Sequence, residues 1–327
     1  MMNLNSKKRK NMKLENYQYK TSDNSIINYY EAENENPILL IIHAQSTSSK
    51  SYSDVVKELS KRFHLILADC YGHGKSSHKR EKYNIVSQGD DLIEFIKHKT
   101  DEKISILGHS SGGLIASYIA SKSDLCNNLI LEDPPLFSSA GEKRFSYYNY
   151  KDLSTVCHNF INQDEEKDFV YYYFMNQYMW NFFPEKSREK IRTKSGKSAL
   201  KYREKHPDKP LKVRFWPKKF LEPYNGMEDY DPYFGENFYN DAFNSGIDYT
   251  ELLSQIDCRT LFMKANTKIG DDGLIMGALS DEDLKQVTDL IKNIRVEYFD
   301  CGHGIHNEKK KEFVKSVIET LNDFNIK

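Results

Sequence analysis

The fold of this chain is decided by the stretch Ile104-Ser105-Ile106-Leu107-Gly108-His109-Ser110-Ser111-Gly112-Gly113. Four residues of strand character end at a glycine, and a run typical of a helix follows the two serines. The Gly-x-Ser-x-Gly pattern between a strand and a helix is typical of a nucleophile elbow, a turn so tight that small residues are needed around the serine. Such a turn lifts the Ser110 hydroxyl above the sheet edge and places the first amide of the next helix beside it. Because three small residues also occur by chance in surface loops, the rest of the chain has to decide whether Ser110 is a nucleophile.

Strands and helices alternate on both sides of this stretch. The five consecutive aliphatic residues Ile38–Ile42 are typical of a strand buried on both faces, as in a parallel sheet. The alternation predicts a doubly wound, mostly parallel α/β sheet, preceded by an antiparallel hairpin over residues 17–30. The predicted strands are 38–42, 64–69, 103–107, 128–132, 260–264 and 295–299, and the predicted helices are 52–62, 84–99, 111–121, 249–256, 281–293 and 308–324.

The alternation stops in the middle of the chain. Residues 136–247 are rich in tyrosine and phenylalanine, contain a charged and helical stretch (185–205), and show no strand of the parallel type. We therefore expect a core of residues 17–135 and 248–327, a mainly helical and aromatic-rich cap of residues 136–247, and a disordered basic tail of residues 1–16. The tail carries Lys7-Lys8-Arg9-Lys10 but no apolar segment behind it, so it does not match a secretory signal.

Composition excludes several classes of partner. The chain has 327 residues, a net charge of -1 and 39% hydrophobic residues. These values favour a soluble globular protein and give no reason to expect a nucleic acid or an acidic membrane as partner. No apolar run approaches the ~18 residues of a membrane span. The five cysteines are widely spaced with no Cys-x-x-Cys pair, which favours the cytoplasm over a disulfide-forming compartment and argues against a structural zinc site.

At this point the chain resembles the α/β-hydrolase fold superfamily, with a cap inserted after the strand that follows the elbow helix. The resemblance covers residues 17–324 and is carried by four motifs in the family's order, each at the end of a predicted strand. They are His43-Ala44-Gln45, Asp69-x-x-Gly72-x-Gly74-x-Ser76, Gly108-His109-Ser110-Ser111-Gly112 and Cys301-Gly302-His303-Gly304.

The resemblance implies a serine nucleophile at Ser110 and a histidine base at His303, with His306 ranked far behind. A serine hydroxyl is a weak nucleophile at neutral pH and needs such a base within hydrogen-bond reach. The family's oxyanion hole implies the backbone amides of Gln45 and Ser111 as donors. Ala44 stands where the family usually has glycine, so the Gln45 backbone is expected to differ slightly.

The acid of the triad has several candidates. Most relatives carry it shortly after the strand that here ends at Lys264, but Lys268 occupies that place and cannot orient a histidine. Asp271 and Asp272 follow and would reach the site only if their loop folds back. Some family members carry the acid at the end of the strand after the elbow helix, where this chain has Glu132-Asp133. We favour Asp133 and keep Glu132, Asp271 and Asp272 as alternatives.

These residues imply a carboxylesterase-like serine hydrolase that cleaves an ester or similar acyl bond without cofactor or metal. The cap aromatics Tyr171, Phe174, Tyr178 and Phe182 have helical spacing, which is more typical of a cap core than of a substrate pocket. A cap must nevertheless contribute one pocket wall, so we expect some of them to contact a small apolar or aromatic substrate. Two alternatives stay open: a carbon–carbon bond hydrolase or lyase on the same scaffold, and a non-catalytic ligand-sensing protein.

Overall fold

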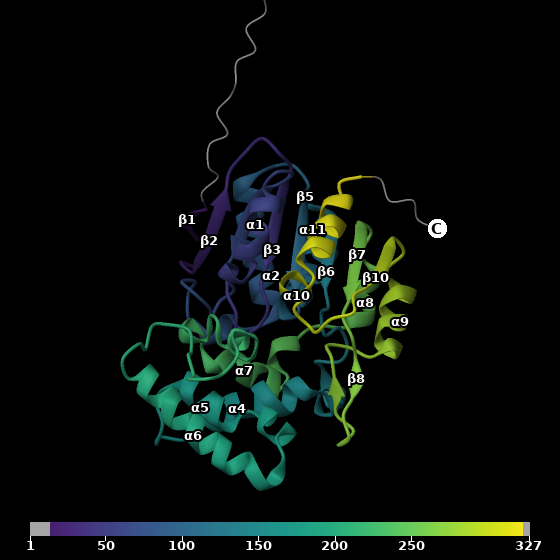
Figure 1. Ribbon diagram of the computed structural model, residues 1–327. Helices are drawn as coiled ribbons and strands as arrows, with labels where there is room; N and C mark the ends of the chain where they lie inside the picture. Colours follow the sequence, from purple (N-terminus) through teal and green to yellow (C-terminus); the bar gives the residue numbers. More distant parts are fainter. Residues whose placement is uncertain (1–13, 323–327) are drawn as a thin grey trace, which may run out of the picture.

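The computed structural model describes residues 14–322 (Figure 1). Most of the predicted basic tail therefore lies outside the described residues. The first strand begins at Glu15, two residues before the predicted start of the core.

A single sheet of eight strands forms the centre of the molecule, in the order β1-β2-β4-β3-β5-β6-β7-β10 (Figure 1). β1 pairs antiparallel with β2, and β2 pairs antiparallel with β4, while all other neighbours are parallel. The doubly wound, mostly parallel sheet was thus predicted correctly. The strands are β1 (Glu15–Lys20), β2 (Ile26–Ala32), β3 (Ile38–Ile42), β4 (His64–Ala68), β5 (Ile104–His109), β6 (Cys126–Glu132), β7 (Arg259–Lys264) and β10 (Ile294–Tyr298).

Both faces of the sheet are covered because its central strands are apolar on both sides. In β3, Leu39 and Ile41 pack in one apolar core, whereas Leu40 and Ile42 pack in the other. The first core is closed by α1 (Ser53–Leu59) and α11 (Lys310–Glu319). The second is closed by α2 (Ile85–Lys99), α3 (Ser111–Lys122), α8 (Tyr249–Ser254) and α9 (Asp281–Leu290). Because both faces of β3 are buried, every residue of the strand is aliphatic, as the sequence run predicted.

Residues 136–247 form a mainly helical layer beyond the carboxyl ends of the strands (Figure 1). Their packing depends on buried aromatic rings, among them Phe174, Trp180 and Phe234. The helices of this layer are α4 (Thr155–Ile161), α5 (Phe169–Asn176), α6 (Glu185–Arg203) and α7 (Pro232–Tyr239). Short helical turns are η1 (Ser49–Tyr52), η2 (Arg80–Lys82), η3 (Gly141–Ser146), η4 (Tyr150–Ser154), η5 (Tyr178–Phe182), η6 (Lys218–Tyr224), η7 (Met227–Asp229) and η8 (Ala242–Asn244).

Three short elements lie outside the predicted alternation. The strands β8 (Lys268–Ile269) and β9 (Ile275–Met276) form a small antiparallel hairpin after β7. The helix α10 (Ile305–Glu308) begins just after the Gly-His-Gly loop and precedes α11. Across residues 14–322, no helix combines the length and the apolar character that crossing a membrane requires.

Candidate active site

Ser110 occupies the sharp turn between β5 and α3. Its backbone has φ 53° and ψ -121°, a conformation that non-glycine residues rarely adopt. The flanking glycines are required by close packing: a Cβ on Gly108 would lie 2.3 Å from the carbonyl oxygen of Gly112, and one on Gly112 would lie 2.3 Å from that of Ile42. The Ser110 amide donates to the Glu132 carbonyl oxygen over 3.0 Å, which ties the turn to β6. The turn thus has the strained geometry of a nucleophile elbow.

His303 contacts Asp133 at the carboxyl edge of the sheet. The His303 Nδ1 lies 2.8 Å from Asp133 Oδ2, and the other carboxyl oxygen accepts the Ala265 amide over 3.1 Å. Asp133 is fully buried and, like Ser110, has a positive φ (45°). Because Oδ2 is an acceptor, the His303 Nδ1 is the protonated nitrogen, which leaves Nε2 free to accept a proton. His303 and Ser110 line the same cavity.

Glu132, the residue before Asp133, contacts His306 and not His303. Its Oε1 lies 2.7 Å from His306 Nδ1 and also accepts the His306 amide, while Oε2 accepts the Tyr52 hydroxyl over 2.9 Å. The Tyr52 and His306 rings stack with centroids 4.2 Å apart. Burial raises the pKa of Glu132, but His306 and His109 outweigh it and lower the pKa to about 2. Glu132 is therefore an ionised carboxylate that anchors α10 to β6.

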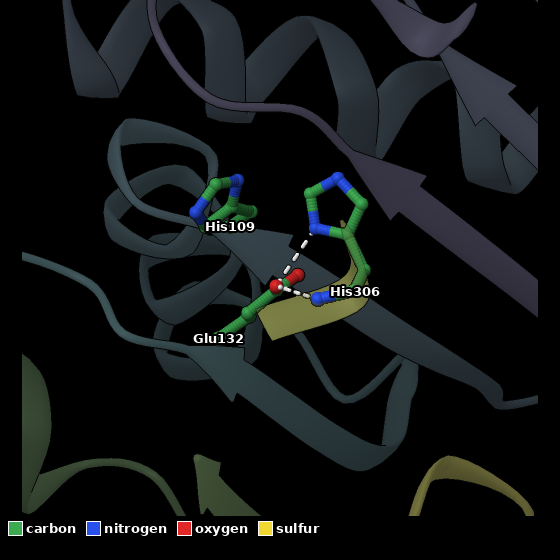
Figure 2. A group of neighbouring side chains, drawn as sticks. All are labelled: His109, Glu132 and His306. Atoms are coloured by element: carbon green, nitrogen blue, oxygen red, sulfur yellow. Dashed lines mark hydrogen bonds and ion pairs between the residues drawn. The ribbon is translucent and has the colours of Figure 1, made fainter. Parts of the chain in front are cut away.

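The buried side chains of His109, Glu132 and His306 form the one group that could hold a metal ion among the described residues (Figure 2). Figure 2 shows both dashed contacts of Glu132 going to His306. The His109 Nε2 is also engaged, 3.0 Å from the carbonyl oxygen of His303. The facing atoms of His306 and Glu132 therefore already bond to each other, which identifies the group as a hydrogen-bond network that supports the His303 loop.

The other two acid candidates lie away from His303. Asp271 and Asp272 are exposed at the turn of the β8–β9 hairpin, and Asp272 accepts the Tyr178 hydroxyl over 2.6 Å. At the end of β7, the buried Lys264 ammonium donates to the Ala265 carbonyl and to the Thr267 hydroxyl. Within residues 14–322, neither Asp271 nor Asp272 bonds to His303, whose carboxylate partner is Asp133.

The loop after β3 carries Gln45 at the cavity wall. Within residues 14–322, the amides of Gln45 and Ser111 donate to no protein acceptor, although both residues are buried and line the cavity. The Gln45 side chain does not point freely into the site, because its Nε2 donates to the Tyr230 hydroxyl over 2.8 Å. This contact, which links the loop to residues 136–247, was not predicted from the sequence.

Two buried histidines fix the backbone of this loop. The His73 Nδ1 lies 3.0 Å from the Tyr71 carbonyl, so its Nε2 is the acceptor for the Ser46 amide. The His43 Nδ1 lies 2.8 Å from the Ala44 carbonyl, so its Nε2 accepts the Cys70 amide. Both rings must be neutral to accept these amides, and burial lowers the pKa of His43 and of His73.

A cavity of about 500 Å³ lies above Ser110 and His303. Its outer wall comes from residues 136–247 and includes the rings of Tyr147, Tyr148 and Tyr173. Asp152 also lines it: burial raises the pKa of this carboxyl group, although the Tyr173 hydroxyl and the Tyr178 amide donate to it. None of the four aromatics that helical spacing singled out lines the cavity. Phe174 is core, Tyr171 is half-buried, Tyr178 bonds the hairpin and Phe182 is exposed.

Comparison with known proteins gives a consistent fold. The model of the alpha/beta hydrolase fold family matches residues 37–310. A putative esterase/lipase from Haemophilus influenzae is 30% identical over 94 residues, which are 29% of this chain and 31% of that protein. The 30 kDa magnesium-chelatase subunit of Rhodobacter capsulatus is 33% identical over 85 residues, which are 26% of this chain and 30% of that protein. The matched region thus spans less than a third of the length of these curated relatives.

Solved structures match nearly the whole chain. An esterase from Exiguobacterium antarcticum superposes with a TM-score of 0.66 at 14% identity, covering 94% of this chain and 100% of that one. A putative lipase from Acinetobacter baumannii superposes with a TM-score of 0.64 at 19% identity, covering 94% and 91%. At these identities the likeness establishes the fold alone.

Proposed function

Because this chain belongs to the α/β-hydrolase fold family, we propose that it is a serine hydrolase that cleaves an ester or similar acyl bond through an acyl-enzyme. In this proposal Ser110 is the nucleophile, His303 the general base and Asp133 the acid. The observation that carries it is the 2.8 Å hydrogen bond between Asp133 and His303, beside the cavity that Ser110 also lines.

The proposed reaction follows from the tautomer of His303, in which Nδ1 carries the hydrogen and Nε2 does not. Its Nε2 takes the proton of the Ser110 hydroxyl as the oxygen attacks the substrate carbonyl, and later gives that proton to the leaving group. Asp133 holds the ring in the required tautomer and stabilises the imidazolium ion that forms. A water molecule, deprotonated by the same histidine, then releases the acyl group and regenerates Ser110.

The negative oxygen of the tetrahedral intermediate needs two aligned N–H donors. We assign this role to the amides of Gln45 and Ser111, since both lack protein acceptors and both residues line the cavity. Ser111 also begins α3, whose positive end favours a negative oxygen at this point.

The cavity supports a small apolar or aromatic substrate. We propose that residues 136–247 act as a cap over Ser110, because their tyrosine rings form the outer wall of a cavity of about 500 Å³. We also place the protein in the cytoplasm, a proposal supported by five cysteines that are all free thiols.

Labelling with a fluorophosphonate probe tests this function, together with hydrolysis of short p-nitrophenyl esters. Ser110→Ala is expected to abolish labelling and turnover, whereas Ser53→Ala is the control and should keep both, because Ser53 is exposed on α1 and does not line the cavity. A wild-type protein that is folded but neither labels nor turns over esters contradicts the proposal. So does a Ser110→Ala variant that labels as well as the wild type.

A further inference from the structure

The charge of this chain is unevenly distributed. Residues 185–219 contain 14 Lys or Arg and only 4 Asp or Glu, a net charge of +10, although the whole chain carries -1. The remaining residues are therefore strongly acidic, at -11. Such separation gives one surface of the molecule a positive potential that the overall charge conceals.

The lysines of α6 form a single stripe along the helix. At 3.6 residues per turn, five exposed lysines of α6 fall within about 80° of its circumference, and a sixth follows two residues after the helix end. The buried residues Ser195, Gly196, Ala199 and Arg203 lie on the opposite side, where α6 packs on the molecule. Within residues 14–322, none of the six lysines forms an ion pair with a carboxylate. They are Lys186, Lys190, Lys194, Lys197, Lys201 and Lys205.

The segment that follows α6 extends the same surface. Residues 211–218 run back along the helix, since the Arg214 amide donates to Ser198 Oγ and the Trp216 indole donates to Ser195 Oγ, both over 3.0 Å. They bring further exposed cations beside the stripe, Lys212, Arg214 and Lys218. Figure 1 places α6 at the edge of the helical layer farthest from the sheet.

Large apolar side chains project from this cationic surface. Phe215 is 82% exposed, the highest value among the exposed large apolar side chains of the described residues, with the Arg214 guanidinium 4.6 Å from its ring centroid. Phe220 is 53% exposed and contacts Trp216, and Leu200 is exposed on α6 itself. Exposing such side chains to water is unfavourable, so their place among lysines calls for a partner that is both anionic and apolar.

We propose that the lysine stripe of α6 and the segment 211–220 form a docking surface for an anionic phospholipid bilayer. Lysines attract the headgroup charge, while exposed phenylalanine and leucine side chains enter the boundary between headgroups and acyl chains. A bilayer satisfies both features at once, whereas a nucleic acid would leave the aliphatic Leu200 without a matching contact.

The docking surface adjoins the cavity above Ser110. Phe220 belongs to the exposed surface and also lines the cavity, as do Glu222 and Pro223 of the same turn. A bilayer bound at this surface therefore lies beside the entrance, and an apolar substrate dissolved in it enters without crossing water.

Co-sedimentation with vesicles tests the docking surface. The full chain is expected to bind vesicles of phosphatidylcholine with phosphatidylglycerol, to ignore phosphatidylcholine alone, and to dissociate as NaCl rises. Lys194→Glu with Lys201→Glu should weaken binding at least ~30-fold, since each lysine near an anionic surface contributes about fivefold. Phe215→Ala should weaken it on the same vesicles without changing the salt dependence.

Matched controls lie on the other parts of the chain. Lys57→Glu with Lys292→Glu reverses two exposed lysines of the α/β core, and Tyr298→Ala removes a side chain that is 74% exposed on β10. All variants should hydrolyse a water-soluble ester as the wild type does, so a failure here is distinguishable from a failure of the proposed catalysis. Equal vesicle binding by the stripe variant and its control overturns the proposal. Binding to an oligonucleotide with none to anionic vesicles overturns it as well.

Discussion

Ser110 and Asp133 share an unfavourable backbone conformation, with φ values of 53° and 45°. A non-glycine residue in this region costs of order 1–3 kcal/mol, and it persists only where the surrounding structure compels it. Gly108 and Gly112 let the turn at Ser110 pack closely against β3. Backbone hydrogen bonds hold Ser110 to β6 and Asp133 to β7. Of the seven non-glycine residues with a positive φ in the described part of the chain, these two are the ones to which we assign chemistry.

At this scale the first prediction concerns the acid. Asp133→Asn is expected to lower kcat by about 10³-fold or more, because an amide can present its NH₂ group to Nδ1 and stabilise the wrong tautomer of His303. Asp272→Asn is the control and should leave kcat within twofold of the wild type. Steady-state hydrolysis of a p-nitrophenyl ester measures both, and full turnover by Asp133→Asn contradicts the assignment.

A second variant separates Glu132 from Asp133. Glu132→Gln removes a charged acceptor from His306 and Tyr52, so it should lower the free energy of unfolding by about 2 kcal/mol or more. Its kcat, measured below the unfolding transition, should fall far less than that of Asp133→Asn. A larger loss of kcat in Glu132→Gln than in Asp133→Asn would reverse the roles of the two carboxylates.

At the scale of elements, the loop after β3 and the segment 224–234 are coupled. Tyr230 holds Gln45, and Gly226 packs against the Thr47 backbone. The Asp231 amide donates to the Gly72 carbonyl in the loop after β4, which fixes the same segment to the core. The position of the proposed oxyanion donor therefore depends on residues almost two hundred positions away in sequence.

This coupling predicts the effect of Tyr230→Phe. Loss of the hydroxyl leaves the buried side-chain amide of Gln45 without its acceptor. The loop should therefore shift, and kcat should fall about tenfold with KM changed little. Tyr233→Phe, three residues later in the first turn of α7, is the matched control, since its hydroxyl makes no hydrogen bond among the described residues. A rise in KM at constant kcat would instead make Tyr230 a substrate contact.

Most helices and strands could be predicted from the sequence, because apolar runs and their periodicity indicate them. The predicted and observed bounds of β3, β4, β5 and α2 agree within a residue or two. The β8–β9 hairpin was not predicted, because strands of two residues have no detectable periodicity. The Gln45–Tyr230 contact escaped because nothing in local sequence encodes a partner so far along the chain. Placing Glu132 and Asp133 at a strand end was possible from sequence, whereas deciding which histidine each one faces required the backbone turn at Asp133.

At the scale of the whole molecule, the net charge of -1 conceals a separation of charge along the chain. It averages a segment of +10 with a remainder of -11, and the helical period places the lysines of α6 on one face.

Global stability should depend on pH through buried neutral histidines. Burial lowers the pKa of His43, of His73 and of His109, the last to about 3. Below pH ~6.5 the unfolded chain binds protons at these histidines that the folded chain does not. The free energy of unfolding should therefore decrease as the pH is lowered, by at most about 1.4 kcal/mol per pH unit for each histidine. It should be constant, as far as these groups are concerned, above that value.

Denaturant titrations at several pH values between 5 and 7.5 measure this slope. His73→Gln keeps an acceptor for the Ser46 amide and should reduce the slope by one histidine's share. His78→Gln alters an exposed histidine of the same loop and should leave it unchanged. Equal slopes in the wild type and in His73→Gln would contradict the prediction.

The two carboxylates at the end of β6 have a consequence for the history of this family branch. Glu132 and Asp133 each engage a separate histidine, His306 and His303, so the loop is held at two points that perform different duties. Descendants that lose catalysis are free to replace Asp133 and His303, yet still need the Glu132–His306 contact to keep α10 in place. Among relatives, substitutions at position 132 should therefore co-vary with those at position 306, and substitutions at 133 with those at 303. The two pairs of positions should vary independently of each other.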